Sequence, residues 1–364
     1  MCIRDSVSPD GKYLAYSISD GGSDWRKWKV LNIEEDRETD DLIEWSKFSY
    51  AVWESDSSGF YYQKYSQPDE ELSDINRSPQ LFFHKLGQSQ LEDQLIYEDQ
   101  QNPDFSWSIN VPEKGDYRVL SIGEGTDERN FLYISVDRSL NFIPLIDKFE
   151  ASYRFLGGSA ETLWFFSNLD APNGKILTLN ISDKKFQWKE LIGEKAYPIS
   201  GASIAGDKLI INYLKDTISQ VEFYNLQGKF LKELPYENIG TLSGFNGRFD
   251  SNTTYFEFSN FTSPQRIYEL DLKSLEYSLY WETTIKNLNN FSICSDQKYV
   301  VFNDVISHEV ASLMTDYLFV KKEAGLLVPP ASLGGDDSQC PLSWSIYGDP
   351  LFDTLLARLA PKLS

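Results

Sequence analysis

An all-β fold made of repeated units is predicted by three features of this sequence. Aromatic residues make up 15% of the 364 residues, and they occur in short runs with β-branched residues, as is typical of strands. Tight-turn sequences separate these runs and recur about every 40–55 residues, the length of one four-stranded propeller blade. No stretch between residues 1 and 284 has a sustained helical period.

The repeating unit is a strand, a tight turn and a second strand rich in aromatic and aliphatic residues. In the first copy, Val7 to Tyr16, Pro9 and Asp10 favour the early turn positions and Gly11 supplies a positive φ. We count six copies; the other five lie within residues 50–62, 105–120, 153–166, 203–213 and 242–258. One such sheet cannot bury both of its faces, so sheets stacked radially, as in a β-propeller, are expected.

Further strands lie between these copies and are expected to form the outer part of each unit. They are residues 29–33, 81–84, 174–180, 220–224 and 266–270. Asn173-Gly174 precedes one of them and predicts a type I′ hairpin turn, because both residues tolerate positive φ.

Charge and composition exclude several classes of function. The net charge of −21 and the lack of a basic cluster argue against nucleic-acid and membrane-surface binding. Cys2, Cys294 and Cys340 form no CxxC pair, and there are only two histidines, so we expect no disulfide framework, metal or cofactor. No signal peptide or membrane-spanning apolar run is found, which predicts a cytoplasmic protein.

Several segments, in order, resemble the propeller of prolyl oligopeptidase. They are residues 8–25, 47–65, 81–99, 160–181 and 252–272, within a similarity that runs from about residue 6 to about residue 284. This resemblance implies a seven-bladed propeller that caps an α/β-hydrolase domain. It also implies a serine endopeptidase that cleaves short peptides after proline, with the propeller as a filter that keeps folded proteins from the active site.

The sequence departs from the family pattern at both ends. The first blade and the catalytic segment before it are not matched, so the six copies would be the remaining blades. Residues 1–5 resemble nothing in the family and are expected to be a remnant of gene assembly. We therefore expect a propeller at residues 1–284, either incomplete or closed by the tail, and an unplaced tail at 285–364.

The tail contains a few recognisable patterns. Residues 292–303 resemble another strand-turn-strand core, which would supply strands for a closing blade. Residues 307–318 and 351–359 have helical spacing, and 325–341 is a loop-like segment rich in Gly, Pro, Ser and Asp. A frame change or chimeric gene is favoured over a genuine fusion, because the chain departs from the family where the catalytic chemistry would begin.

The catalytic residues of the family have no counterpart in this sequence. No Gly-x-Ser-x-Gly motif is present, and the nearest match, residues 157–161, ends in Glu161 and lies between two predicted strands as a hairpin turn. His84 lies in a predicted strand and is expected to be packed and hydrogen-bonded. His308 is followed by Glu309 but lacks the second histidine of a zinc-peptidase motif. We assign no catalytic, cofactor-binding or metal residue, and expect the chain to be inactive alone.

The leading hypothesis is therefore the substrate-gating propeller of a prolyl-oligopeptidase-like serine endopeptidase. Its expected partners are an α/β-hydrolase catalytic domain and short proline-containing peptides. A stand-alone β-propeller that binds partners without catalysis is the alternative, and a non-functional fragment is a third hypothesis. A ring that lacks one blade would expose strand edges, which predicts marginal stability.

Overall fold

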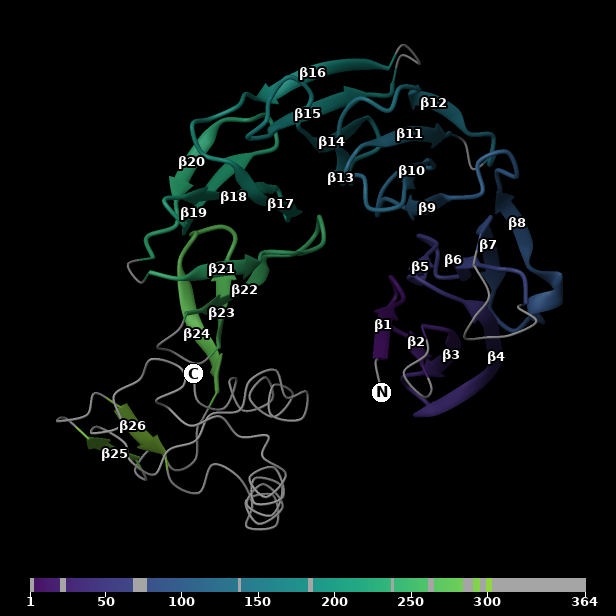
Figure 1. Cartoon of the computed structure of the whole chain (residues 1–364), viewed down its shortest axis with the longest axis horizontal. Helices are drawn as coiled ribbons and strands as arrows, with labels where there is room; N and C mark the ends of the chain where they lie inside the picture. The colour runs from purple at the N-terminus through teal and green to yellow at the C-terminus, as the bar shows by residue number, and fades with distance from the viewer. Residues whose placement is uncertain are drawn as a thin grey trace, which may run out of the picture. The chain divides into compact units, whose positions relative to one another are not determined.

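The computed structural model describes residues 3–19, 24–67, 77–136, 139–182, 186–236, 239–260 and 265–283, together with the backbone of 291–294 and 299–302. Its regular elements there are strands, apart from the short 3-10 helix η1, Gln90–Glu92 (Figure 1). None of the described helical residues forms a segment long and apolar enough to cross a membrane. The prediction of an all-β fold is confirmed.

The first eight strands form one sheet in the order β1-β2-β3-β4-β6-β7-β8, and β5 pairs with β6. The pairing of Ser46 with Lys64 joins β4 to β6, so the sheet consists of two four-stranded halves. The strands are Ile3–Val7 (β1), Tyr13–Ile18 (β2), Arg26–Asn32 (β3), Arg37–Ser46 (β4), Val52–Trp53 (β5), Gly59–Lys64 (β6), Gln80–Lys85 (β7) and Gln94–Tyr97 (β8).

The strands that follow form four sheets of four, each with its strands neighbouring in chain order, and one two-stranded sheet. The first two sheets contain Phe105–Asn110 (β9), Arg118–Glu124 (β10), Asn130–Ser135 (β11), Ile143–Ile146 (β12), Tyr153–Gly158 (β13), Thr162–Ser167 (β14), Lys175–Asn180 (β15) and Gln187–Ile192 (β16). The others contain Ile199–Ala205 (β17), Lys208–Lys215 (β18), Ile218–Asn225 (β19), Phe230–Glu233 (β20), Thr241–Gly244 (β21), Thr253–Ser259 (β22), Arg266–Asp271 (β23), Tyr277–Glu282 (β24), Phe291–Cys294 (β25) and Tyr299–Phe302 (β26). The described residues thus hold six four-stranded units, as the six sequence copies predict.

The strands expected at the outer part of each unit are third strands and not edge strands. β15, for example, pairs with β14 on one side and with β16 on the other. The fourth strands were missed because they are short or polar: most side chains of β16 and β20 are at least partly exposed, so burial imposes little pattern on their sequences.

The predicted turns are confirmed in one case and wrong in another. Gly11 has a φ of 75°, and its N–H donates to the carbonyl of Ser8 at 2.9 Å, as the first turn requires. Asn173-Gly174 does not form a type I′ turn, because only Gly174, at φ 85°, lies in the left-handed region. The side-chain amide of Asn173 instead donates to the carbonyl of Lys195 at 3.0 Å, and this hydrogen bond anchors a longer connection between β14 and β15.

The structure describes part of residues 1–5 and part of the tail at 285–364, the two segments that do not resemble the family. Ile3 pairs with Ile18 and Asp5 pairs with Tyr16 in β1 and β2, which shows how residues 3–5 fold but not where they come from. A strand needs only backbone pairing there, so the expectation that residues 1–5 are a remnant of gene assembly stays a prediction. In the tail, β25 and β26 pair antiparallel as the pattern predicted. The predicted turn at 295–298 and the predictions for 307–318, 325–341 and 351–359 lie outside the described residues.

The core consists of apolar layers between consecutive sheets. One layer joins the two halves of the first sheet, with Trp28 of β3 and Phe60 of β6 both almost fully buried. The next joins Tyr61 and Leu81 to Leu120 of β10. Two similar layers follow between the β9–β12 and β13–β16 sheets and between the β13–β16 and β17–β20 sheets. Each sheet thereby buries the face that it cannot bury alone.

One loop makes contacts with three other sheets, and we call residues 245–252, between β21 and β22, the crossing loop. Nη1 of Arg248 donates to the carbonyl of Pro9 in the first turn at 2.7 Å. The N–H of Phe249 donates to Glu113 at 3.0 Å, and the carbonyl of Arg248 accepts from Gly206 at 2.8 Å. The chain divides into two compact units, and all these residues belong to the first, which comprises Met1–Asn238, Leu242–Phe256 and Leu270–Tyr277.

Candidate functional site

The nearest match to a nucleophile motif has a structural role. Ser159 lies in the turn between β13 and β14, where its Oγ accepts a hydrogen bond from the N–H of Thr162 at 3.1 Å. Its carbonyl accepts from the buried hydroxyl of Tyr117 at 2.9 Å. A side chain at Gly158 would lie 1.9 Å from that hydroxyl, so the glycine allows this close packing. The interpretation of residues 157–161 as a hairpin turn is confirmed.

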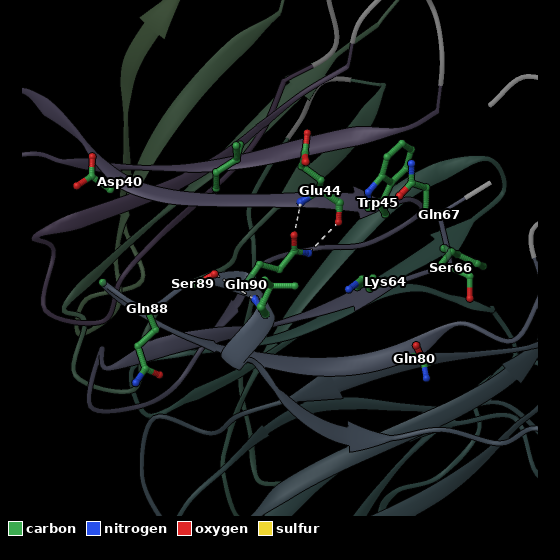
Figure 2. Close-up of a pocket in the computed structure, with 14 residues that line it drawn as sticks. Asp40, Glu44, Trp45, Lys64, Ser66, Gln67, Gln80, Gln88, Ser89 and Gln90 are labelled. Carbon is green, nitrogen blue, oxygen red and sulfur yellow. Dashed lines mark hydrogen bonds between the residues drawn. The ribbon is translucent and has the colours of Figure 1, made fainter. Parts of the chain in front are cut away.

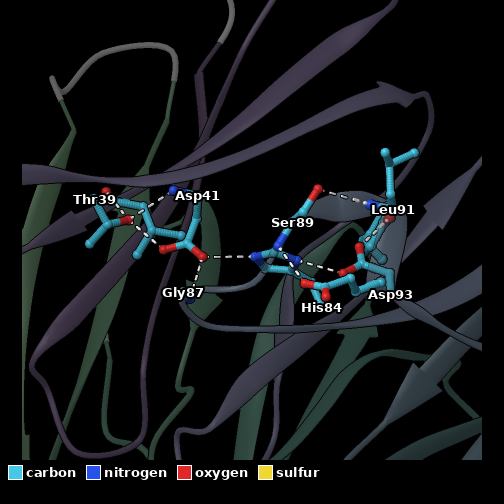
Figure 3. A network of polar contacts seen from close by, with 10 residues as sticks. Thr39, Asp41, His84, Gly87, Ser89, Leu91 and Asp93 are labelled. Atoms are coloured by element: carbon cyan, nitrogen blue, oxygen red, sulfur yellow. Dashed lines mark hydrogen bonds and ion pairs between the residues drawn. The ribbon is translucent and has the colours of Figure 1, made fainter.

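His84 lies fully buried on β7, between the carboxylates of Asp41 on β4 and Asp93 beside η1 (Figure 3). Its Nε2 is 2.9 Å from Asp41 Oδ1, and its Nδ1 is 2.8 Å from Asp93 Oδ1. Burial opposes the charged imidazolium, but the hydrogen bonds to the two carboxylates outweigh it and raise the pKa of His84 to about 9. With both ring nitrogens engaged, this histidine has no lone pair for a metal or for proton abstraction. It is packed and hydrogen-bonded, as predicted.

The carboxylates on either side of His84 are themselves well satisfied. Asp41 accepts from Thr39 Oγ1 and from the N–H of Gly87, both at 2.6 Å. Burial raises the pKa of Asp41, but the hydrogen bonds from His84, Thr39 and Gly87 outweigh it and keep that pKa below its usual range. Asp93 accepts from the hydroxyl of Tyr62 at 2.7 Å. This network therefore joins β4, β6, β7 and η1 and is complete without a ligand.

A hollow of about 850 Å³ lies beside this network, over β4 and η1 (Figure 2). Glu44 and Gln90 exchange two hydrogen bonds in it: the Glu44 N–H donates at 3.1 Å, and the Gln90 amide donates to the Glu44 carbonyl at 2.9 Å. The other lining residues include the carboxylate of Asp40, three glutamine amides, two serines and exposed apolar side chains such as Leu91. No nucleophile paired with a base lines this hollow, and we assign no chemistry to it.

A second hollow has a volume of about 1150 Å³, and we call it the β9 cavity. Its floor is the cavity-facing side of β9 and β10, where every second residue is small or polar: Ser106, Ser108, Asn110, Ser121 and Gly123. The intervening residues Phe105, Trp107 and Ile109 also border the cavity, although Trp107 and Ile109 are buried in an apolar layer. The alternation of the strands therefore leaves an open polar floor on a rigid sheet.

Aromatic side chains stand at one side of the β9 cavity. Phe48 and Tyr50 lie in the connection between β4 and β5 and are 62% and 64% exposed. Residues 152–155 of the β13 region, among them Arg154, form another side. Exposed aromatics beside a polar floor, in a concave site of this size, are typical of a ligand-binding cavity.

A buried ion pair lies behind the cavity wall and holds two sheets together. The guanidinium of Arg118 on β10 donates to the carboxylate of Glu54, in the turn between β5 and β6. The hydroxyl of Tyr61, whose ring lines the cavity, donates to the same carboxylate at 2.9 Å. Burial, with the nearby charge of Glu54, raises the pKa of Tyr61 to about 12, so this hydroxyl keeps its proton. The wall is fixed by charge as well as by packing.

Sequence reasoning assigned no residue to this cavity. Phe48 and Tyr50 lie in the segment 47–65 that resembles the family, but the sequence does not show that they are exposed. Aromatic residues just before a strand normally indicate core. Phe48 and Tyr50 lie in the connection between β4 and β5. Exact strand boundaries, had the sequence given them, would have placed both residues outside the strands and indicated that they are exposed.

The fold and the cavity define a propeller-type protein, built from four-stranded antiparallel units with apolar layers between them. The family model of the prolyl oligopeptidase N-terminal β-propeller domain matches residues 4–283, and the chain belongs to this family. The resemblance noted from the sequence is confirmed.

Two curated relatives illustrate the similarity. The prolyl endopeptidase of Elizabethkingia meningoseptica is 30% identical over 302 residues, which cover 82% of this chain and 42% of the relative. Prolyl oligopeptidase A of Amanita bisporigera is 28% identical over 308 residues, which cover 77% of this chain and 40% of the relative. The chain thus spans about two fifths of the length of these relatives.

Solved structures agree on the fold. A structure from a study of inter-domain dynamics in two prolyl endopeptidases matches with a TM-score of 0.72 at 28% identity, over 79% of this chain and 42% of that chain. Prolyl oligopeptidase B from Galerina marginata, bound to a 35mer hydrolysis and macrocyclization substrate, matches with a TM-score of 0.73 at 23% identity, over 79% of this chain and 44% of that chain. The second likeness supports the fold alone.

Proposed function

We propose that this chain is the substrate-gating propeller of a serine endopeptidase that cleaves short peptides after proline. An α/β-hydrolase domain would supply the nucleophile, because the described residues contain no serine paired with a histidine. Membership of the family supports the pairing with such a domain. The propeller's own task would be to admit and hold the peptide.

The β9 cavity is the observation that carries this proposal. A volume of about 1150 Å³ accommodates a short peptide but no folded domain. Proline-containing peptides dock readily on exposed aromatic rings, because their extended conformation is already restricted. Phe48 provides such a ring, and the serines of β9 provide hydrogen-bonding groups for the peptide backbone.

A chimera tests the proposal. Residues 4–283 would replace the matching segment of the Elizabethkingia meningoseptica prolyl endopeptidase, which supplies the rest of the enzyme. We expect the chimera to cleave a Gly-Pro-linked chromogenic substrate and to leave a folded protein with exposed prolines intact. A folded chimera without activity, or one that degrades folded proteins, would contradict the gating role.

The 364-residue chain alone is the matched control. It should not turn over the chromogenic substrate, since no nucleophile and base are paired in the described residues. Turnover abolished by a serine-directed inhibitor would show that the chain carries chemistry of its own.

A further inference from the structure

Arg154 is a cation without a counterion in the wall of the β9 cavity. It lies on β13, and its Cζ stands 4.8 Å from the ring centroid of Phe166 on β14. No carboxylate among the residues that the structure describes forms an ion pair or hydrogen bond with it. Stacking on the ring fixes the plane of the guanidinium and leaves its N–H groups available.

The other charged groups around the cavity are mostly neutralised. Arg129 donates to both oxygens of Asp127, with Nη2 at 2.6 Å from Oδ2 and Nε at 3.0 Å from Oδ1. Oδ1 of Asp104 is 3.1 Å from Nε of Arg77. Glu128 also lines the cavity but forms no ion pair with Arg154 in the described structure. Arg154 is therefore the cation of this wall that remains available to a ligand.

The chain has 55 acidic and 34 basic residues, yet no carboxylate among the described residues pairs with Arg154. The side chain is open to solvent, yet the protein atoms around it still lower the pKa of Arg154, and no neighbouring anion offsets this. A guanidinium nevertheless stays protonated in proteins. Its partial desolvation costs free energy that a bound anion would recover.

We propose that Arg154 binds a carboxylate of the peptide in the β9 cavity, so that the preferred ligands are proline-containing peptides with a free C-terminus or an acidic side chain. This inference rests on the proposed function and adds the substrate class. A planar guanidinium matches a carboxylate with two parallel hydrogen bonds, and the Phe166 ring holds it ready for that geometry.

The test measures peptide binding to the 364-residue chain by fluorescence anisotropy. Three dye-labelled hexapeptides with one proline are compared: a neutral amidated peptide, the same peptide with a free C-terminal carboxylate, and an amidated version with Glu in place of Gln. We expect at least one carboxylate peptide to bind about tenfold more tightly than the neutral one, the effect of one charge-assisted hydrogen bond. The preferred peptide identifies whether a C-terminus or a side chain supplies the carboxylate.

Variants assign the preference to Arg154. Arg154→Gln should abolish it and leave the affinity for the neutral peptide unchanged, while Arg154→Lys should retain part of it. Arg129→Gln is the matched control and should keep the full preference, because Arg129 is already paired with Asp127. Melting temperatures near that of the parent chain would show that each variant is folded.

The possible failures are distinguishable. Equal binding of neutral and carboxylate peptides, or equal weakening of both by Arg154→Gln, would overturn this inference and leave the proposed function standing. If none of the three peptides binds, both this inference and the proposed function would be overturned.

Discussion

Arg118 and Glu54 lie 64 positions apart in the sequence and meet as a buried ion pair between β10 and the turn that precedes β6. Nε of Arg118 also donates to the hydroxyl of Tyr61 at 3.2 Å, while the buried Nη1 has no partner in the described structure. This pair joins the first sheet to the second, and Tyr61, which donates to the same Glu54 carboxylate, lines the β9 cavity, so loss of the pair should affect both stability and peptide binding.

The first prediction concerns this pair. Arg118→Met should lower the free energy of unfolding by about 3–5 kcal/mol, because it leaves the Glu54 carboxylate buried without a counterion. Adding Glu54→Gln should restore part of that loss. Arg129→Ala, which breaks an exposed pair, is the control and should change stability little. Urea denaturation measures all three, and similar losses for Arg118→Met and Arg129→Ala would contradict the buried pair.

The second prediction concerns pH. The folded-state pKa of His84, about 9, lies above its ordinary value of 6.5, so the folded state binds the proton more tightly than the unfolded state. The stabilisation from this group is complete below pH 6.5 and is lost as pH rises through about 9. It amounts to about 3 kcal/mol at most, by proton linkage. Urea denaturation between about pH 6 and pH 10 should show this fall.

A matched pair of variants assigns the pH dependence. His308→Gln should keep the slope, whereas His84→Gln should remove it and also lower stability at about pH 6, because Asp41 and Asp93 lose their shared partner. If His84→Gln does not fold, Asp93→Asn provides a milder change that should reduce the slope. A parent chain whose stability is constant across this range would rule out a charged His84.

The third prediction compares two strand glycines. A Cβ at Gly59 would lie 2.0 Å from the carbonyl oxygen of His84, whereas a Cβ at Gly123 meets nothing within 4 Å. Gly59→Ala should therefore destabilise the chain by about 1–3 kcal/mol through overpacking. Gly123→Ala should have little effect. Thermal melts decide, and equal melting temperatures for the two variants would show that β6 and β7 do not pack this closely.

The fourth prediction concerns the β9 cavity itself. Gly123→Phe should fill the cavity floor without backbone strain and weaken binding of the neutral hexapeptide by at least about tenfold. Phe48→Ala should weaken binding by about three- to tenfold, because an exposed ring that stacks on proline is lost. Leu91→Ala, at an exposed position outside the cavity, is the control. Unchanged affinity in Gly123→Phe would place the peptide elsewhere.

The sequence predicted the inner part of each sheet well and the outer part poorly. The turn at Gly11 and strands such as β14 were identifiable, because glycine conformation constrains the first and nearly continuous burial constrains the second. β20 and β16 were not, because exposed edge strands are held mainly by backbone pairing.

The candidate site was less predictable than the fold. That Phe48 is exposed and Trp107 is buried depends on which sheet packs against which, and no local pattern encodes this. Arg154 is informative only because acidic side chains on other described elements do not reach it, which is a three-dimensional property. His84 was correctly judged to be packed, but its two partners come from positions 43 residues before and 9 residues after it.

The hydrogen bond from Arg248 of the crossing loop to the carbonyl of Pro9 links positions 239 residues apart. During synthesis, the first turn leaves the ribosome long before Arg248 is made, so this hydrogen bond can form only after the amino-terminal sheets have been synthesised. Maturation of the first unit is therefore expected to be a late, concerted event, and truncations that remove the crossing loop should leave the amino-terminal sheets susceptible to proteases.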